Sequence, residues 1–121
     1  MEPLAGNVEK IHRWCVEHGA DLVLVVLPRA YQYSDREVPR DVDAGEYARL
    51  GPFCLEPFRF FDELRSRVDY PVLSLLEDFR QTSVFPVCFE DNSHWNPAGH
   101  QVAAQAIAKG IAPVVERRLS R

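Results

Sequence analysis

The chain has 121 residues, of which 46% are hydrophobic and 26% charged, and its net charge at pH 7 is −4. These values are typical of one globular domain, here spanning residues 1–121, and they exclude disordered and collagen-like chains. The negative balance provides no broad cationic surface, so we expect no nucleic-acid partner.

The sequence shows no apolar run of transmembrane length, since the longest, Leu22 to Leu27, is only as long as a strand. We therefore expect no membrane span. The first residues lack the basic and apolar regions of a signal peptide, so the chain as it stands reads as cytoplasmic. A leader could still precede an incomplete chain, which leaves its localisation open. The three cysteines, with no Cys-x-x-Cys spacing, favour free thiols in a reducing compartment.

The sequence pattern of the N-terminal third predicts a helix followed by a buried strand. Apolar residues recur at helical spacing between Asn7 and His18, and Gly19 is a typical helix stop. The run from Asp21 to Leu27 is aliphatic without alternation, which indicates a strand covered on both faces, as in a parallel sheet. Residues on the predicted buried face of the helix are Val8, Ile11, Trp14 and Cys15. We expect Trp14 to belong to the core.

Residues 29–56 form an irregular connection, with turn chemistry at Asp41 to Gly45 and a short predicted helix at Glu46 to Leu50. The connection leaves the carboxyl end of a predicted parallel strand, where open α/β sheets bind ligands. Arg29 and Tyr31 are therefore candidate substrate-binding residues. The alternative, which we favour, is a solvated loop whose aromatic side chains fold onto the surface.

The second half predicts a helix over Pro57 to Val68, a second buried strand over Tyr70 to Leu76, and a final helix from Pro97 to about Leu119. Asn96 precedes the final helix as its cap, and proline is favoured in the first turn. Two successive helix–strand units imply a parallel pair joined by a right-handed crossover. The predicted buried positions are Phe58, Phe61, Leu64 and partly Phe60 in the first of these helices, and Val102, Ala103, Ala106, Ile107, Ile111, Val114 and Val115 in the second.

Two strands are too few for an independently stable sheet, for which about three are needed. The segment Val84 to Phe89 could be a third strand or part of a loop. We favour a sheet that lacks strands, which would lie before Met1 or come from another chain.

The segment Asp91-Asn92-Ser93-His94, just before the final helix, places a carboxylate and an imidazole three residues apart. An ionised Asp91 that accepts from one ring nitrogen of His94 would fix its tautomer and leave the other nitrogen able to take a proton. One alternative is a purely structural turn. Another is a metal site in which His100 is a third ligand, since all three residue types bind divalent metals.

The last block, Asp91-Asn92-Ser93-His94-Trp95-Asn96-Pro97-Ala98-Gly99-His100, resembles the Asp-x-x-His block of SGNH (GDSL-type) hydrolases. The lead-in is also similar, with the strand that runs into Pro28, the Phe60-Phe61-Asp62-Glu63-Leu64 helix and the second strand. The likeness covers most of this chain but about half of the family's domain.

This resemblance implies a flavodoxin-like three-layer α/β/α fold with a parallel sheet, here incomplete, and cleavage or transfer of acyl groups from small-molecule or carbohydrate esters. It assigns Asp91 and His94 as triad acid and base and implies no cofactor or metal. Trp95 is favoured as a packing residue at the base of the site, with substrate contact as the alternative.

The family's Gly-Asp-Ser block and its oxyanion Gly and Asn blocks have no counterpart in this sequence. We therefore expect the chain to be inactive alone unless a second polypeptide supplies the N-terminal half. The alternative is a non-catalytic α/β binding module that retains the final block for structural reasons.

Overall fold

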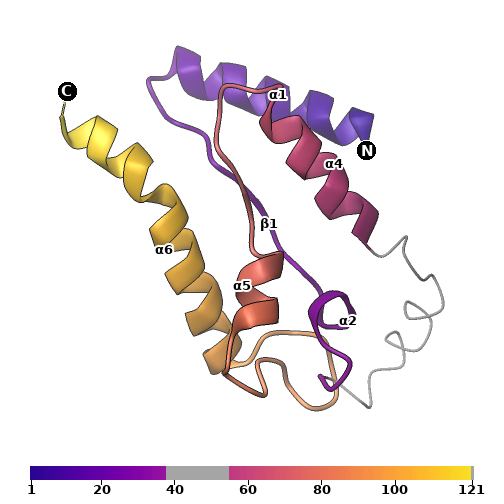
Figure 1. The fold of residues 1–121 in the computed structure, drawn as a ribbon. Coiled ribbons are helices and arrows are strands. Elements are labelled where there is room, and N and C mark those ends of the chain that lie inside the picture. The colour runs from indigo at the N-terminus through magenta and orange to yellow at the C-terminus, as the bar shows by residue number, and fades with distance from the viewer. Residues whose placement is uncertain (38–54, 121) are drawn as a thin grey trace.

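The computed structural model of the protein describes residues 1–37 and 55–120. Helices and strands follow one another as α1 (Glu2–Glu17), β1 (Leu24–Val26), α2 (Ala30–Tyr33), α4 (Glu56–Arg65), β2 (Val72–Ser74), α5 (Leu76–Gln81) and α6 (Pro97–Leu119). Within these residues the two strands form a parallel pair with helices on both sides (Figure 1). The predicted α/β class and the parallel pairing are confirmed.

The register of the sheet places Leu24 opposite Val72 and Val26 opposite Ser74. Successive side chains of a strand point to opposite faces, so neighbouring residues of β1 contribute to two separate cores. Val26 and Val72 face α1 and α4, where they pack with Phe58, Phe61, Leu64 and Tyr70. Val25 lies on the opposite face, toward α6, where the buried residues are Ala30, Leu75, Phe79, Val87, Cys88, Val102 and Ala103.

Both strands are shorter than the sequence predicts. The ladder covers three residues on each strand, and Leu76, predicted to end the second strand, instead begins α5. The Ser74 hydroxyl accepts the Leu76 backbone N–H at 3.4 Å, which turns the chain into that helix. The segment Val84 to Phe89 is not a third strand, because its one bridge, Cys88 with Trp95, lies outside the sheet.

The first helix begins at Glu2, earlier than predicted, with Pro3 in its first turn. Gly19 adopts φ +67° just beyond the helix, as expected for a glycine stop. The prediction that Trp14 and Ile11 are core residues is wrong, since they are 57% and 53% exposed. The Trp14 ring stacks instead on His18, with the ring centroids 4.1 Å apart.

The predicted buried face of α4 is confirmed, since Phe58, Phe61 and Leu64 are buried and Phe60 is half-buried. The helix ends at Arg65, before the predicted end at Val68. Along α6 the predicted stripe is buried only at Val102 and Ala103. Val115 is 47% exposed, so the expectation of burial is wrong there.

The turn at Asp41 to Gly45, the short helix at Glu46 to Leu50 and Cys54 lie outside the described residues. In the ranges 1–37 and 55–120, no helix is both long and apolar enough to cross a membrane.

Candidate active site

The Asp91–His94 segment forms the tip of a tight loop that backbone hydrogen bonds close. The Phe89 N–H donates to the His94 carbonyl at 3.0 Å, and Cys88 and Trp95 form an antiparallel bridge. One step further from the tip, the Asn96 N–H donates to the Val87 carbonyl at 3.0 Å. Because the two sides of the loop are hydrogen-bonded to each other, the residues between them are held against the start of α6.

Both polar atoms of the Asn96 side chain connect this loop to the helix. Its Oδ1 accepts the Gly99 N–H at 3.0 Å, the capping bond that the sequence predicts. Its Nδ2 donates to the carbonyls of Pro86 at 2.9 Å and Cys88 at 3.0 Å. A Cβ on Gly99 would collide with the Val87 carbonyl oxygen, so only glycine lets the helix approach the loop this closely.

The acid and the base are brought together through a third side chain. The structure forms no direct hydrogen bond or ion pair between Asp91 and His94. Instead, His94 Nδ1 lies 3.0 Å from Asn92 Oδ1, and Asn92 Nδ2 donates to Asp91 Oδ1 at 2.9 Å. The expected direct contact is thus replaced by an Asp91–Asn92–His94 chain, because the amide of Asn92 occupies the space between the other two groups.

This arrangement determines which ring nitrogen carries the proton. The atom of Asn92 that faces the imidazole also faces the backbone N–H of His94, at 3.0 Å. A backbone N–H can only donate, so that atom is the amide oxygen, and Nδ1 of His94 must donate to it as N–H. In the neutral ring Nε2 therefore holds the lone pair, as a general base requires.

His94 is exposed, and Nε2 has no hydrogen-bond partner among the residues that the structure describes. Apolar side chains are exposed near this loop: Val84 is 43% exposed, Phe85 51% and Phe89 48%. Phe89 is adjacent to the histidine through its backbone bond. The imidazole is thus accessible to a reactant. The segment Val84 to Phe89, which precedes the loop, has exposed apolar side chains.

Trp95 forms the base of the loop. Its indole stacks on the buried Phe79, with centroids 4.7 Å apart and planes at 20°, and meets His100 edge-on at 5.9 Å. It is half-buried against the α6-side core. This position matches the favoured interpretation of Trp95 as a packing residue.

Three residues under the loop form a polar cluster that the sequence analysis did not identify. The Tyr33 hydroxyl lies 3.1 Å from Cys88 Sγ, and the buried carboxylate of Glu37 accepts the N–H groups of Val87 at 2.7 Å and Cys88 at 3.3 Å. Burial raises the pKa of Tyr33, and the hydrogen bond to Cys88 raises it further. No local sequence signal marks these contacts, because they join residues 50 or more positions apart.

The candidate substrate residues Arg29 and Tyr31 lie at the start of α2, directly after β1. α2 contacts the loop through Tyr33 and Cys88, so the predicted connection does reach the His94 region. Arg29 is exposed and forms no hydrogen bond or ion pair with Asp91 or His94, while its backbone N–H donates to Gln32 Oε1 at 2.7 Å. Tyr31 is half-buried on the same turn.

The metal interpretation is not supported by the geometry. In the part of the chain that the structure describes, no three His, Cys, Asp or Glu side chains are grouped so as to hold a metal ion. Asp91, His94 and His100 are all described, so they do not form such a group.

Comparison of the chain with protein-family models, with curated proteins and with solved structures finds no match.

Proposed function

We propose that the chain provides the base and the acid of a Ser-His-Asp triad that cleaves or transfers acyl groups from esters, as in SGNH-type enzymes. The observation that carries the proposal is the geometry of His94, an exposed residue whose Nδ1 is fixed by Asn92 and whose Nε2 has no partner among the described residues. The finer fold assignment, an incomplete flavodoxin-like α/β/α sheet, is part of the same proposal.

In the proposed reaction, Nε2 of His94 takes the proton from a serine hydroxyl as the oxygen attacks the ester carbonyl. The same nitrogen then gives that proton to the leaving alcohol, and an acyl-serine remains. The imidazolium formed between these steps donates from Nδ1 to Asn92 Oδ1, with the Asp91 charge one hydrogen bond beyond. Since the sequence contains no Gly-Asp-Ser block, the serine and the oxyanion donors come from polypeptide outside these 121 residues.

The gene tests this proposal directly. We expect the DNA upstream of the Met1 codon to encode a Gly-Asp-Ser block, in frame or displaced by a frame error. If that DNA encodes no such block, and no partner polypeptide that carries one co-purifies with the chain, the proposed triad lacks its nucleophile and is wrong.

The assembled protein tests the role of His94. With the serine-bearing segment present, His94→Ala should lower kcat/KM for p-nitrophenyl acetate by about 10⁴-fold, because the base is lost. His100→Ala, an exposed histidine six residues away, is the matched control and should keep activity. Equal losses in both variants would contradict the assignment.

The chain alone tests the tautomer. ¹⁵N chemical shifts should show His94 as the Nδ1–H form, and Asn92→Ala should convert it to a mixture of tautomers. An Nε2–H tautomer in the unaltered chain would contradict the role of Asn92.

A further inference from the structure

β2 has an edge that no strand covers in the described part of the chain. The Pro71 carbonyl accepts from β1 at 2.9 Å and the Leu75 N–H donates to β1 at 3.1 Å. Residues between these alternate in direction, so Val72 and Ser74 direct their N–H and C=O groups away from β1. Outward-directed backbone groups that no other strand pairs with are a template for another strand.

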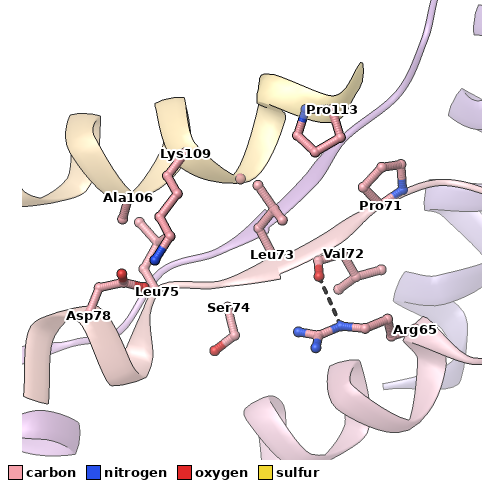
Figure 2. Close-up of a pocket in the computed structure, with 11 residues that line it drawn as sticks. Arg65, Pro71, Val72, Leu73, Ser74, Leu75, Asp78, Ala106, Lys109 and Pro113 are labelled. Atoms are coloured by element: carbon pink, nitrogen blue, oxygen red, sulfur yellow. Dashed lines mark hydrogen bonds between the residues drawn. The ribbon is translucent and has the colours of Figure 1, made fainter. Parts of the chain in front are cut away.

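A groove of about 520 Å³ runs along this edge (Figure 2). This volume is within the range of ligand-binding pockets, roughly 300–1,000 Å³. On one side, α6 presents the small or flat residues Ala106, Gly110 and Pro113. Gly110 matters most, because a Cβ there would meet the Leu73 side chain that forms the floor.

Two cations approach the groove from opposite sides, Arg65 from α4 and Lys109 from α6 (Figure 2). Arg65 Nε donates to the outward carbonyl of Val72 at 3.1 Å, and its guanidinium pairs with Asp62 at 3.3 Å. Lys109 forms no ion pair with any described residue. Among the described residues of the lining, Asp78 is the one carboxylate beside these two cations.

We propose that this groove binds an extended acidic segment of a partner polypeptide, which pairs with β2 as an additional strand. Backbone bonds to Val72 and Ser74 would give affinity, and carboxylates at the ends of the segment would meet Arg65 and Lys109. A second copy of β2 is disfavoured as the occupant, because two copies meeting edge to edge would oppose the same pair of cations. The proposal does not depend on His94.

Arg65 makes the site selective for acidic segments. While its Nε holds the Val72 carbonyl, one of the outward backbone groups is covered. A carboxylate is a stronger acceptor than a neutral carbonyl, because a charge-assisted hydrogen bond is roughly twice as strong. Arg65 already pairs with Asp62, so an acidic segment offers it a second carboxylate, which competes with the Val72 carbonyl for Nε and uncovers the strand edge. A neutral or basic segment offers no such carboxylate.

The test uses the full ¹⁵N-labelled chain and the peptide acetyl-Glu-Val-Thr-Val-Glu-amide, with acetyl-Lys-Val-Thr-Val-Lys-amide as control. We expect the acidic peptide to slow amide hydrogen exchange at Val72 and Ser74 and to leave Val25, on the outer edge of β1, unchanged. The basic peptide should bind at least about tenfold more weakly.

Two charge variants complete the test, since both alter exposed lysines and should fold. Lys109→Glu should lower the affinity for the acidic peptide about fivefold or more, while Lys10→Glu on α1 should leave that affinity unchanged. The proposal is overturned if neither peptide binds, if both bind equally, or if protection appears at Val25 instead. It is also overturned if light scattering shows a dimer whose Val72 and Ser74 amides are already protected without peptide.

Discussion

The two ends of α6 differ in how far their apolar residues are buried. At the start, Asn96 caps the helix, Gly99 contacts the Val87 carbonyl, and Val102 and Ala103 are buried. Toward the end, Val115 is 47% and Leu119 83% exposed. The difference teaches that an apolar stripe is buried only where another segment lies beneath it, here the Val87–Trp95 loop.

The largest contrast should come from adding one methyl group near the start of α6 and one just beyond its middle. Gly99→Ala places its Cβ against the rigid backbone of Val87, so we expect a loss of about 3 kcal/mol in unfolding free energy. Gly110→Ala meets the mobile end of the Leu73 side chain, and the roughly 1 kcal/mol gained in helix propensity offsets that contact. Urea denaturation of both variants measures the difference. Equal losses would contradict the close approach at Gly99.

A smaller contrast is expected from the polar groups at the two ends. Asn96→Ala removes the cap and both Nδ2 bonds, which should cost about 2 kcal/mol. Ser120→Ala removes one exposed bond to the Glu116 carbonyl and should change stability by less than about 0.5 kcal/mol. Thermal unfolding followed by circular dichroism compares them. A cost at Ser120 that matched the cost at Asn96 would remove the distinction between the ends.

The smallest expected effect is a pH-dependent change in stability. It concerns Tyr33, which contacts the loop that precedes Asn96. The pKa of Tyr33 is raised in the folded chain by burial, above its ordinary value of 10.0. Above about pH 10 the unfolded chain loses the tyrosine proton while the folded chain keeps it, so stability falls as the pH rises.

Tyr33→Phe should therefore reduce the loss of stability between pH 9 and pH 11. It should cost about 1 kcal/mol at pH 7, where the contact with Cys88 is lost. Urea midpoints of the unaltered chain and of Tyr33→Phe across this pH range provide the measurement. An unchanged alkaline slope in Tyr33→Phe would contradict the burial effect.

Local patterns predicted much of the fold. The cap at Asn96, the stop at Gly19 and the buried face of α4 each depend on residues within a few positions of one another, so the sequence contains the whole signal. The prediction that Trp14 is buried is wrong because helical periodicity identifies an apolar face but does not show whether another segment covers it. The predicted end of the second strand is wrong because Ser74 turns the chain through a side-chain bond that hydrophobicity does not reveal.

The assignment of Asp91 and His94 as acid and base stays a prediction, and their expected direct contact is not formed. Asp91 and His94 do lie at one loop tip, yet spacing alone could not show that Asn92 would stand between them. Glu37 was unpredictable, since its partners Val87 and Cys88 are half a chain away. The roles of Arg29 and Tyr31 remain predictions.

The parallel register has a kinetic consequence. Leu24 pairs with Val72, 48 positions along the chain, so no rung of the ladder can form until the intervening polypeptide has closed into a loop. Closing a loop of that length costs roughly 3 kcal/mol in chain entropy before any strand contact repays it. The helices can form early from local contacts, and the sheet should appear late and set the folding rate.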